Sequence, residues 1–287
     1  MSELTLEAAL PGTRLQRSAG KWRLGPLLAF SFLAFLIIAA LLPQWFAHSD
    51  PLAIVPHDAF HPPGWAHWFG TDQSGRDIFS RVIHGTRQSL FIGLAATALA
   101  MSIAIVLGLL GGLGGAYLDR GVGWLLEILF AFPSLILALL FVAVFGSGIG
   151  PLIVATGLGG APGYARMVRG QVLAVRNAGY IEAAKALGHP PLRIITRQLL
   201  PNAMRPLIVT LTMGVGQAIV WASALSFLGL GARPPAPEWG TMLSMGRDFI
   251  ANAWWLTFFP GLFIVLTTLS TTVAGRYLQQ RLEGRLT

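Results

Sequence analysis

The sequence contains no cysteine. That absence excludes disulfide bonds, thiol catalysis and thiolate metal sites. Charge is also scarce: only 11% of the 287 residues are charged and 54% are hydrophobic. Ordinary soluble domains carry about 25% charged residues, so a deficit on this scale indicates that lipid is the solvent for much of the chain.

Lysine is nearly missing as well, since the chain holds only Lys21 and Lys185. A phosphate-binding P-loop needs a lysine that follows a glycine and precedes serine or threonine. Lys21 precedes Trp22 and Lys185 follows Ala184, so neither lysine fits the pattern. We therefore expect no nucleotide or other cofactor on this chain.

What the sequence does contain is a set of long stretches without any charged residue. A helix needs about 20 residues to cross a bilayer. Four stretches suit one crossing each: residues 24–47, 88–118, 206–232 and 249–275. A cleaved secretory signal is the alternative for the first stretch, but no small-residue cleavage site follows Leu42, and the stretch is longer than such signals.

Residues 128–165 also lack charge and are too long for one crossing. The segment from Gly146 to Pro151 reads GSGIGP, and this density of glycine and proline breaks a helix. The break divides the stretch into two spans and brings the total to six. We therefore expect an all-α, polytopic membrane protein with six transmembrane helices. Gly108 and Gly112 have the spacing that lets a neighbouring helix approach closely.

The basic residues are distributed unevenly between the two sides of such a bundle. Of the 20 lysines and arginines, 15 fall in segments on the side of the N-terminus, seven of them between residues 166 and 205. An excess of basic residues marks the cytoplasmic side of a bacterial inner membrane. Both termini are therefore expected in the cytoplasm, and the formal charge of +8 needs no nucleic-acid partner.

This topology divides the chain into five parts. They are a cytoplasmic basic tail (1–23), a first transmembrane helix (24–47), a periplasmic segment (48–87), a core of five transmembrane helices (88–276) and a cytoplasmic tail (277–287). The periplasmic segment is expected to end in an amphipathic helix that lies in the outer interface. Asp72 or Ser74 would cap it, and Asp77 and Arg81 would pair one turn apart.

Residues 179–202, GYIEAAKALGHPPLRIITRQLLPN, interrupt the apolar chain with a polar stretch. Gly188 fits the left-handed end of a first short helix. A second short helix follows, and Pro201 is expected to end it. Positive charge bias places this hairpin in the cytoplasm.

The hairpin has two interpretations. Ala183 and Ala184 would leave a shallow surface beside the charge of Glu182, which suits a docking element for a soluble partner. The alternative is a hairpin that lies in the membrane interface and docks no partner.

The fifth span carries polar or amphipathic side chains among apolar ones. Gln217, Trp221 and Ser223 are the candidates for a translocation path. Polar groups inside a span face protein or a water-filled path rather than lipid. A secondary transporter would show inverted repeats and buried ionisable groups, and neither is visible in this sequence.

A membrane enzyme would need a cluster of acid, base or metal-binding groups. Its candidates are His48, His57, His61 and His67. The proline pair at 62–63 breaks the helix that would align His57 with His61. We therefore interpret them as loop histidines and expect no metal site and no catalytic residue.

Three stretches carry a resemblance to a known family. EAA at 182–184, followed by Gly188 and then LLP at 199–201, resembles the signature loop of importer permeases of the ATP-binding-cassette class. HWFGTDQSGRDIFSRVIHGTRQSL at 67–90 and SFLGLGARPPAPEWGTML at 226–243 resemble the dipeptide/oligopeptide/nickel permease family, in the second (C-type) of its two membrane subunits. Gln198 and Ala161 depart from the family's usual residues.

The resemblance implies a type I ABC importer permease fold and a role for matched positions. Glu182, Ala183, Ala184 and Gly188 would form the element that docks in the ATPase subunit. A second set would close a periplasmic gate or contact the binding protein, or merely brace the fold: Asp72, Arg76, Asp77, Arg81, Arg87, Pro235 and Trp239.

The resemblance also implies partners and cargo. The partners would be a homologous permease subunit, two ATPase subunits that bind ATP and Mg, a periplasmic or lipid-anchored solute-binding protein, and membrane lipid. The cargo would be dipeptides or oligopeptides, with nickel or a metal chelate as the alternative.

Overall fold

The computed structural model describes residues 24–131 and 134–282. Their helices are α1 (Leu24–Leu41), α2 (Ile78–Leu113), α3 (Ala116–Ala131), α4 (Ser134–Phe145), α5 (Ile149–Arg176), α6 (Gly179–Ala186), α7 (Pro191–Ile194), α8 (Leu200–Phe227), α9 (Trp239–Gly246) and α10 (Trp255–Leu282). In this part of the chain the β pairing is limited to an isolated bridge between Thr71 and Asp77. The expectation of an all-α protein is confirmed.

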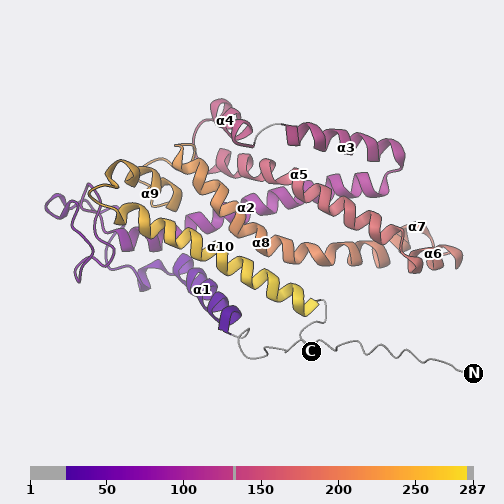
Figure 1. Cartoon of the computed structure of the whole chain (residues 1–287), viewed down its shortest axis with the longest axis horizontal. Helices are drawn as coiled ribbons and strands as arrows, with labels where there is room; N and C mark the ends of the chain where they lie inside the picture. The colour runs from indigo at the N-terminus through magenta and orange to yellow at the C-terminus, as the bar shows by residue number, and fades with distance from the viewer. Residues whose placement is uncertain (1–23, 132–133, 283–287) are drawn as a thin grey trace, which may run out of the picture.

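The long helices run side by side along the long axis of the molecule (Figure 1). The loops before α2 gather with α9 at one end, and α6 and α7 project at the other. The start of α1 and the end of α10 point toward the α6–α7 end. The expected tail at 1–23 lies outside the described residues, and so do residues 283–287 of the expected tail at 277–287. Residues 277–282 of that tail are instead the last part of α10.

Helices α2 and α5 pack closely at the centre of the bundle. A Cβ at Gly108 would lie 2.5 Å from Cγ1 of Val168, and a Cβ at Gly112 would overlap Val172. The predicted small-residue contact is therefore confirmed. We call this contact between α2 and α5 the glycine seam. Val168 and Val172 belong to a buried cluster that also contains residues of α6 and α8, so the glycine seam and the polar hairpin share one core.

The helices do not form six separate membrane-crossing spans of similar length. Four helical stretches are long and apolar enough to cross: α1, α2, the continuous stretch Pro191–Phe227, and α10. The bent pair α3 and α4 makes a fifth if it crosses as one. Helix α5 has 28 residues, enough to cross by length, but carries arginine at 166, 169 and 176. Six crossings result only if α5 and the bent pair both cross.

Two helix boundaries differ from the sequence expectations at the end where the loops before α2 gather with α9, which is the end expected to be outer. The expected interfacial helix is not a separate element, because α2 runs unbroken for 36 residues from Ile78. Asp77 caps it, and its side chain accepts a hydrogen bond from Ser80 N at 2.8 Å. Asp72 and Ser74 lie in the turn before the helix, where Asp72 accepts from Ser74 N.

Pro201 does not end the second short helix, so that expectation is wrong. A π-helical segment, Ile195–Leu199, joins α7 to α8, and Leu200 N donates to Ile195 O. Pro201 then falls in the first turn of α8, where a missing backbone N–H costs little. The break predicted at GSGIGP is confirmed, because Gly146 ends α4 with a φ of +81°.

Candidate functional site

The α6–α7 hairpin turns where the sequence predicts it. Gly188 has a φ of +76°. His189 N donates to Ala184 O at 3.2 Å and Gly188 N donates to Lys185 O at 3.0 Å. These two bonds form the Schellman arrangement, which satisfies carbonyls left free at a helix end. The turn is therefore fixed by backbone geometry.

The hairpin presents one face outward and buries the other. Glu182 and Ala183 are exposed. Ala184 is only 3% exposed and packs with Ile181, Ile194 and other residues of the buried cluster that α5, α6 and α8 share. The expectation that both alanines leave a shallow outer surface is therefore met by Ala183 and not by Ala184, which anchors the hairpin.

The hairpin is connected to the two long helices α5 and α8 by very short linkers. Only Asn177 and Ala178 separate α5 from α6, and α7 continues through the π segment into α8. Arg176 Nη1 donates to Gly112 O at 3.0 Å, which ties the end of α5 to α2. Arg169 pairs with Asp119, with Nη2 2.8 Å from Oδ2, and ties α5 to α3. The hairpin is therefore joined to α5 by two residues and to α8 by a continuous helical segment.

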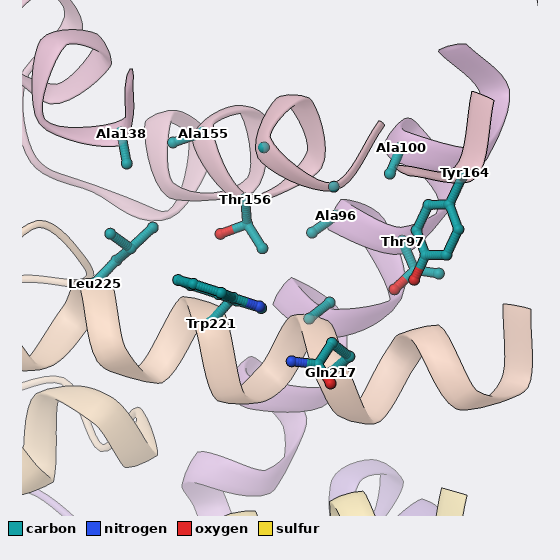
Figure 2. Close-up of a pocket in the computed structure, with 13 residues that line it drawn as sticks. Ala96, Thr97, Ala100, Ala138, Ala155, Thr156, Tyr164, Gln217, Trp221 and Leu225 are labelled. Atoms are coloured by element: carbon teal, nitrogen blue, oxygen red, sulfur yellow. The ribbon is translucent and has the colours of Figure 1, made fainter. Parts of the chain in front are cut away.

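Helices α5 and α8, together with α2 and α4, line a cavity of about 140 Å³ (Figure 2). Gln217 and Trp221 of α8, two of the three candidates for a translocation path, are among the residues that line it. Ser223 does not line it: that residue is 4% exposed and lies against Gly240 of α9. Ser223 therefore belongs to the contact between α8 and α9.

Sequence reasoning missed three other polar residues of the cavity: Thr97 on α2, and Thr156 and Tyr164 on α5. Thr156 and Tyr164 stand in the glycine-rich run ATGLGGAPGYAR. Polar side chains in a membrane span would have been the signal to note, but the sequence does not show that α2, α5 and α8 meet at this point.

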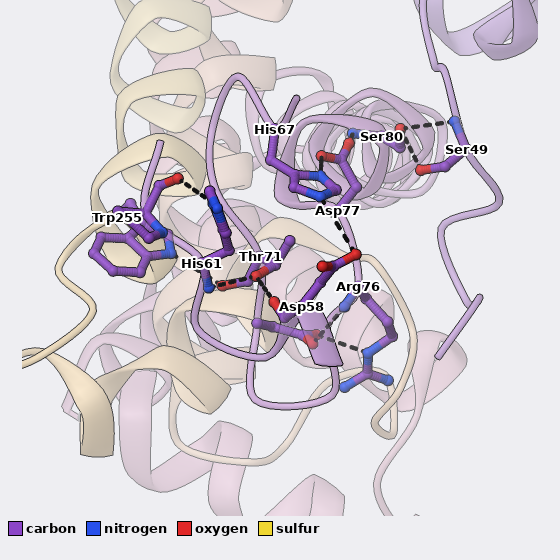
Figure 3. A network of polar contacts seen from close by, with 11 residues as sticks. Ser49, Asp58, His61, His67, Thr71, Arg76, Asp77, Ser80 and Trp255 are labelled. Carbon is purple, nitrogen blue, oxygen red and sulfur yellow. Dashed lines mark hydrogen bonds and ion pairs between the residues drawn. The ribbon is translucent and has the colours of Figure 1, made fainter. Parts of the chain in front are cut away.

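At the outer end, a network of polar contacts fixes the loops before α2 (Figure 3). Asp72 accepts from Arg76 Nε at 2.7 Å. Arg81, 1% exposed, donates to Pro51 O at 3.0 Å and to Pro235 O at 3.1 Å, and its Nε lies 3.8 Å from Asp72. Arg81 thus pairs with Asp72 rather than with Asp77, and it joins three separate segments.

The last outer loop is fastened to α2 by a second set of contacts. Trp239 is fully buried and its Nε1 donates to Val82 O at 3.0 Å. Glu238 caps α9 and accepts from Gly240 N and Thr241 N, each at 2.8 Å. These contacts make the loop part of the folded core.

The seven outer candidates therefore divide into two groups. Five are buried: Asp72, Arg76, Asp77, Arg81 and Trp239. Arg87 and Pro235 are exposed. In this conformation only the exposed pair is available to another protein, so the interpretation as a brace of the fold fits the buried five.

The histidines of the outer segment do not gather into a metal site. His67 contacts Asp77 at 3.1 Å and lies 3.7 Å from Asp58. Within residues 24–131 and 134–282, no three His, Cys, Asp or Glu side chains are placed so that they could hold a metal ion.

The arrangement of these helices is similar to that in solved ABC transporters. Inward-facing structures of the MetNI methionine ABC transporter match with a TM-score of 0.58 at 23% identity, over 69% of this chain and 95% of that chain. An amino acid ABC transporter solved with histidines matches with a TM-score of 0.55 at 18% identity, over 72% and 94%. These likenesses show the fold.

Residues 104–284 match the model of the family described as binding-protein-dependent transport system inner membrane component, and the chain belongs to this family. The Di/tripeptide transport system permease protein DppC of Pseudomonas aeruginosa is 39% identical, over 93% of this chain and 89% of its own length. The Glutathione transport system permease protein GsiD of Pectobacterium atrosepticum is also 39% identical, over 89% and 85%. The family resemblance read from the sequence is confirmed. The chain is a membrane-embedded, non-catalytic permease subunit.

Proposed function

We propose that this chain is one of two membrane subunits of an ATP-driven importer for dipeptides and short oligopeptides. A homologous permease would complete the pore, two ATPase subunits would bind ATP and Mg, and an external binding protein would deliver cargo. Peptides are favoured because relatives named for di/tripeptide and dipeptide transport share about two fifths of its residues.

The observation that carries the proposal is the short connection between the hairpin and the two helices that line the cavity. The hairpin exposes Glu182 at one end of the molecule and is continuous with α8, while α5 ends two residues before it. Both helices line the cavity. ATP-driven approach of the ATPase subunits would move the hairpin and tilt α5 and α8, which would open the cavity to alternate sides. Each ligand shifts this equilibrium only by its differential affinity for the two states.

The orientation follows from the charge distribution. Of the 15 basic residues that the structure describes, ten lie in α3, α5, residues 179–205 and α10. The start of α1 and the end of α10 point toward the hairpin end (Figure 1). Because basic loops stay on the cytoplasmic side, we place the hairpin and both termini in the cytoplasm. The loops around Asp72 and Pro235 would then face the periplasm and the binding protein.

Reconstitution tests this function. The complete complex is placed in liposomes with ATP on the hairpin side and binding protein on the other, and uptake of labelled dialanine is compared with uptake of nickel. We expect dialanine to accumulate only when both ATP and binding protein are present. Accumulation of nickel alone would establish the metal-importer alternative. A complex that hydrolyses ATP but accumulates neither contradicts the proposal.

A further inference from the structure

We propose that the cavity between α2, α5 and α8 is a subsite for the uncharged amide portion of the cargo, and that Thr156 and Gln217 recognise it. This inference rests on the proposed function. It adds a selective role for the membrane subunit itself, separate from the choice made by a binding protein.

The first observation is an unsatisfied hydroxyl. Thr156 is 9% exposed, and its Oγ1 is buried without a hydrogen-bond partner in the described part of the chain. Buried hydroxyls are normally paired, because desolvating one without a partner is unfavourable. The side chain points into the cavity toward Trp221 (Figure 2). Thr97, in the same cavity, already donates to Gly93 O at 2.8 Å.

Three further polar groups border the cavity. Gln217 and Trp221 project from α8, and Tyr164 projects from α5. Gly214 leaves room for the Tyr164 hydroxyl, which would otherwise overlap a Cβ at that position. The Gln217 amide and the Tyr164 hydroxyl can each donate and accept, and the Trp221 indole N–H can donate. A peptide amide, which has one N–H and one C=O, is complementary to such a mixed set.

The walls set the size and charge of what can enter. The residues between the polar groups are small or apolar, among them Ala96, Ala100, Ala155 and Gly159, and no lining residue is charged. A charged side chain would lose its water and find no opposite charge, which is costly. A small or apolar residue with a neutral amide loses little. The cavity therefore favours neutral over charged residues of a peptide.

Two substitutions test the assignment, measured as uptake ratios in the reconstituted complex. Gln217→Glu adds a charge at nearly constant shape, and Thr156→Val removes the hydroxyl at nearly constant volume. Thr212→Val is the control, because its hydroxyl donates within α8 to Ile208 O and it does not line the cavity. The binding protein and the ATPase subunits are identical in every assay, so a changed ratio reports the membrane subunit.

We expect Gln217→Glu to raise the ratio of alanyl-lysine to dialanine uptake about tenfold, as a charge-assisted hydrogen bond would. Thr156→Val should lower dialanine uptake about fivefold, as the loss of one hydrogen bond would, while Thr212→Val leaves it unchanged. An unchanged ratio in an assembled Gln217→Glu complex, or identical uptake by Thr156→Val and Thr212→Val, overturns the subsite. If Gln217→Glu does not assemble, the two threonine variants decide alone. A parent complex that imports no peptide contradicts the proposed function instead.

Discussion

Glycine is required at Gly188 by the backbone conformation and at Gly85 by the closeness of a neighbouring loop. Gly188 has a positive φ and open space where a Cβ would stand. Gly85 lies inside α2, but a Cβ there would overlap the carbonyl oxygen of Pro237. The first requirement is readable from the sequence because a helix end is a local feature. The second depends on a loop far along the chain, and the sequence does not reveal it.

Replacing Gly188 tests the turn. Gly188→Val forces a β-branched residue into the left-handed region, at a cost of about 1–3 kcal/mol. We expect the hairpin to distort and peptide uptake to fall, while insertion into the membrane is kept. Gly179→Ala is the control, because Gly179 also has open space and no positive φ. Full uptake by Gly188→Val would show that the turn tolerates another geometry.

Arg81 connects three loop segments through its contacts with Pro51, Asp72 and Pro235. Arg81→Met keeps much of the apolar stem but leaves Pro51 O and Pro235 O without their donor and Asp72 with one cation fewer. Removing one partner of a buried charged pair costs about 3–5 kcal/mol. We expect a lower thermal midpoint of the purified subunit and faster protease cleavage in residues 48–77.

The matched control for this change is Arg87→Met, on the same helix and exposed. Exposed substitutions of this kind change stability by about 0.5 kcal/mol or less. Equal thermal midpoints for the two variants would mean that Arg81 contributes no more than a surface arginine.

At the scale of elements, the sequence predicts what local chemistry determines. The Gly/Pro break before α5 and the turn at Gly188 were both foreseen. The π segment was not, because an i→i+5 bond has no sequence pattern as clear as a cap, and without it Pro201 looks like a stop. The same limit applies to Thr156, whose importance depends on α8 lying opposite α5.

The hairpin is the element whose exposed charge can be tested directly. Glu182 forms no ion pair within the described residues, although Lys185 stands on the same short helix. A charge-assisted contact with the ATPase subunit would contribute about 1.5–3 kcal/mol. We expect Glu182→Lys to release the ATPase subunits during purification and to abolish peptide-stimulated hydrolysis.

Charge reversal on the partner provides the control. A basic residue of the ATPase cleft changed to glutamate should restore part of the binding lost in Glu182→Lys. If Glu182→Lys retains its ATPase subunits and its uptake, docking depends on the shape of Ala183 and the turn rather than on charge.

At the scale of the whole molecule, the absence of cysteine makes the orientation easy to measure. Single cysteines are placed at His61, in the outer loops, and at Leu187, which is 76% exposed in the hairpin. We expect the first to react with a membrane-impermeant thiol reagent in intact cells and the second only after lysis. The reverse pattern would invert the topology and separate the hairpin from any cytoplasmic ATPase.

The glycine seam between α2 and α5 has a genetic consequence. A Cβ at Gly108 meets both the Val168 side chain and the backbone nitrogen of Arg169, so even alanine does not fit without movement. Every missense change of a glycine codon adds at least that one carbon. Selection for assembly alone would therefore keep this position glycine through long divergence. In a mutational scan, substitutions at Gly108 would be tolerated as poorly as substitutions at a residue that touches cargo. The constraint on Gly108 is nevertheless the distance between two helices.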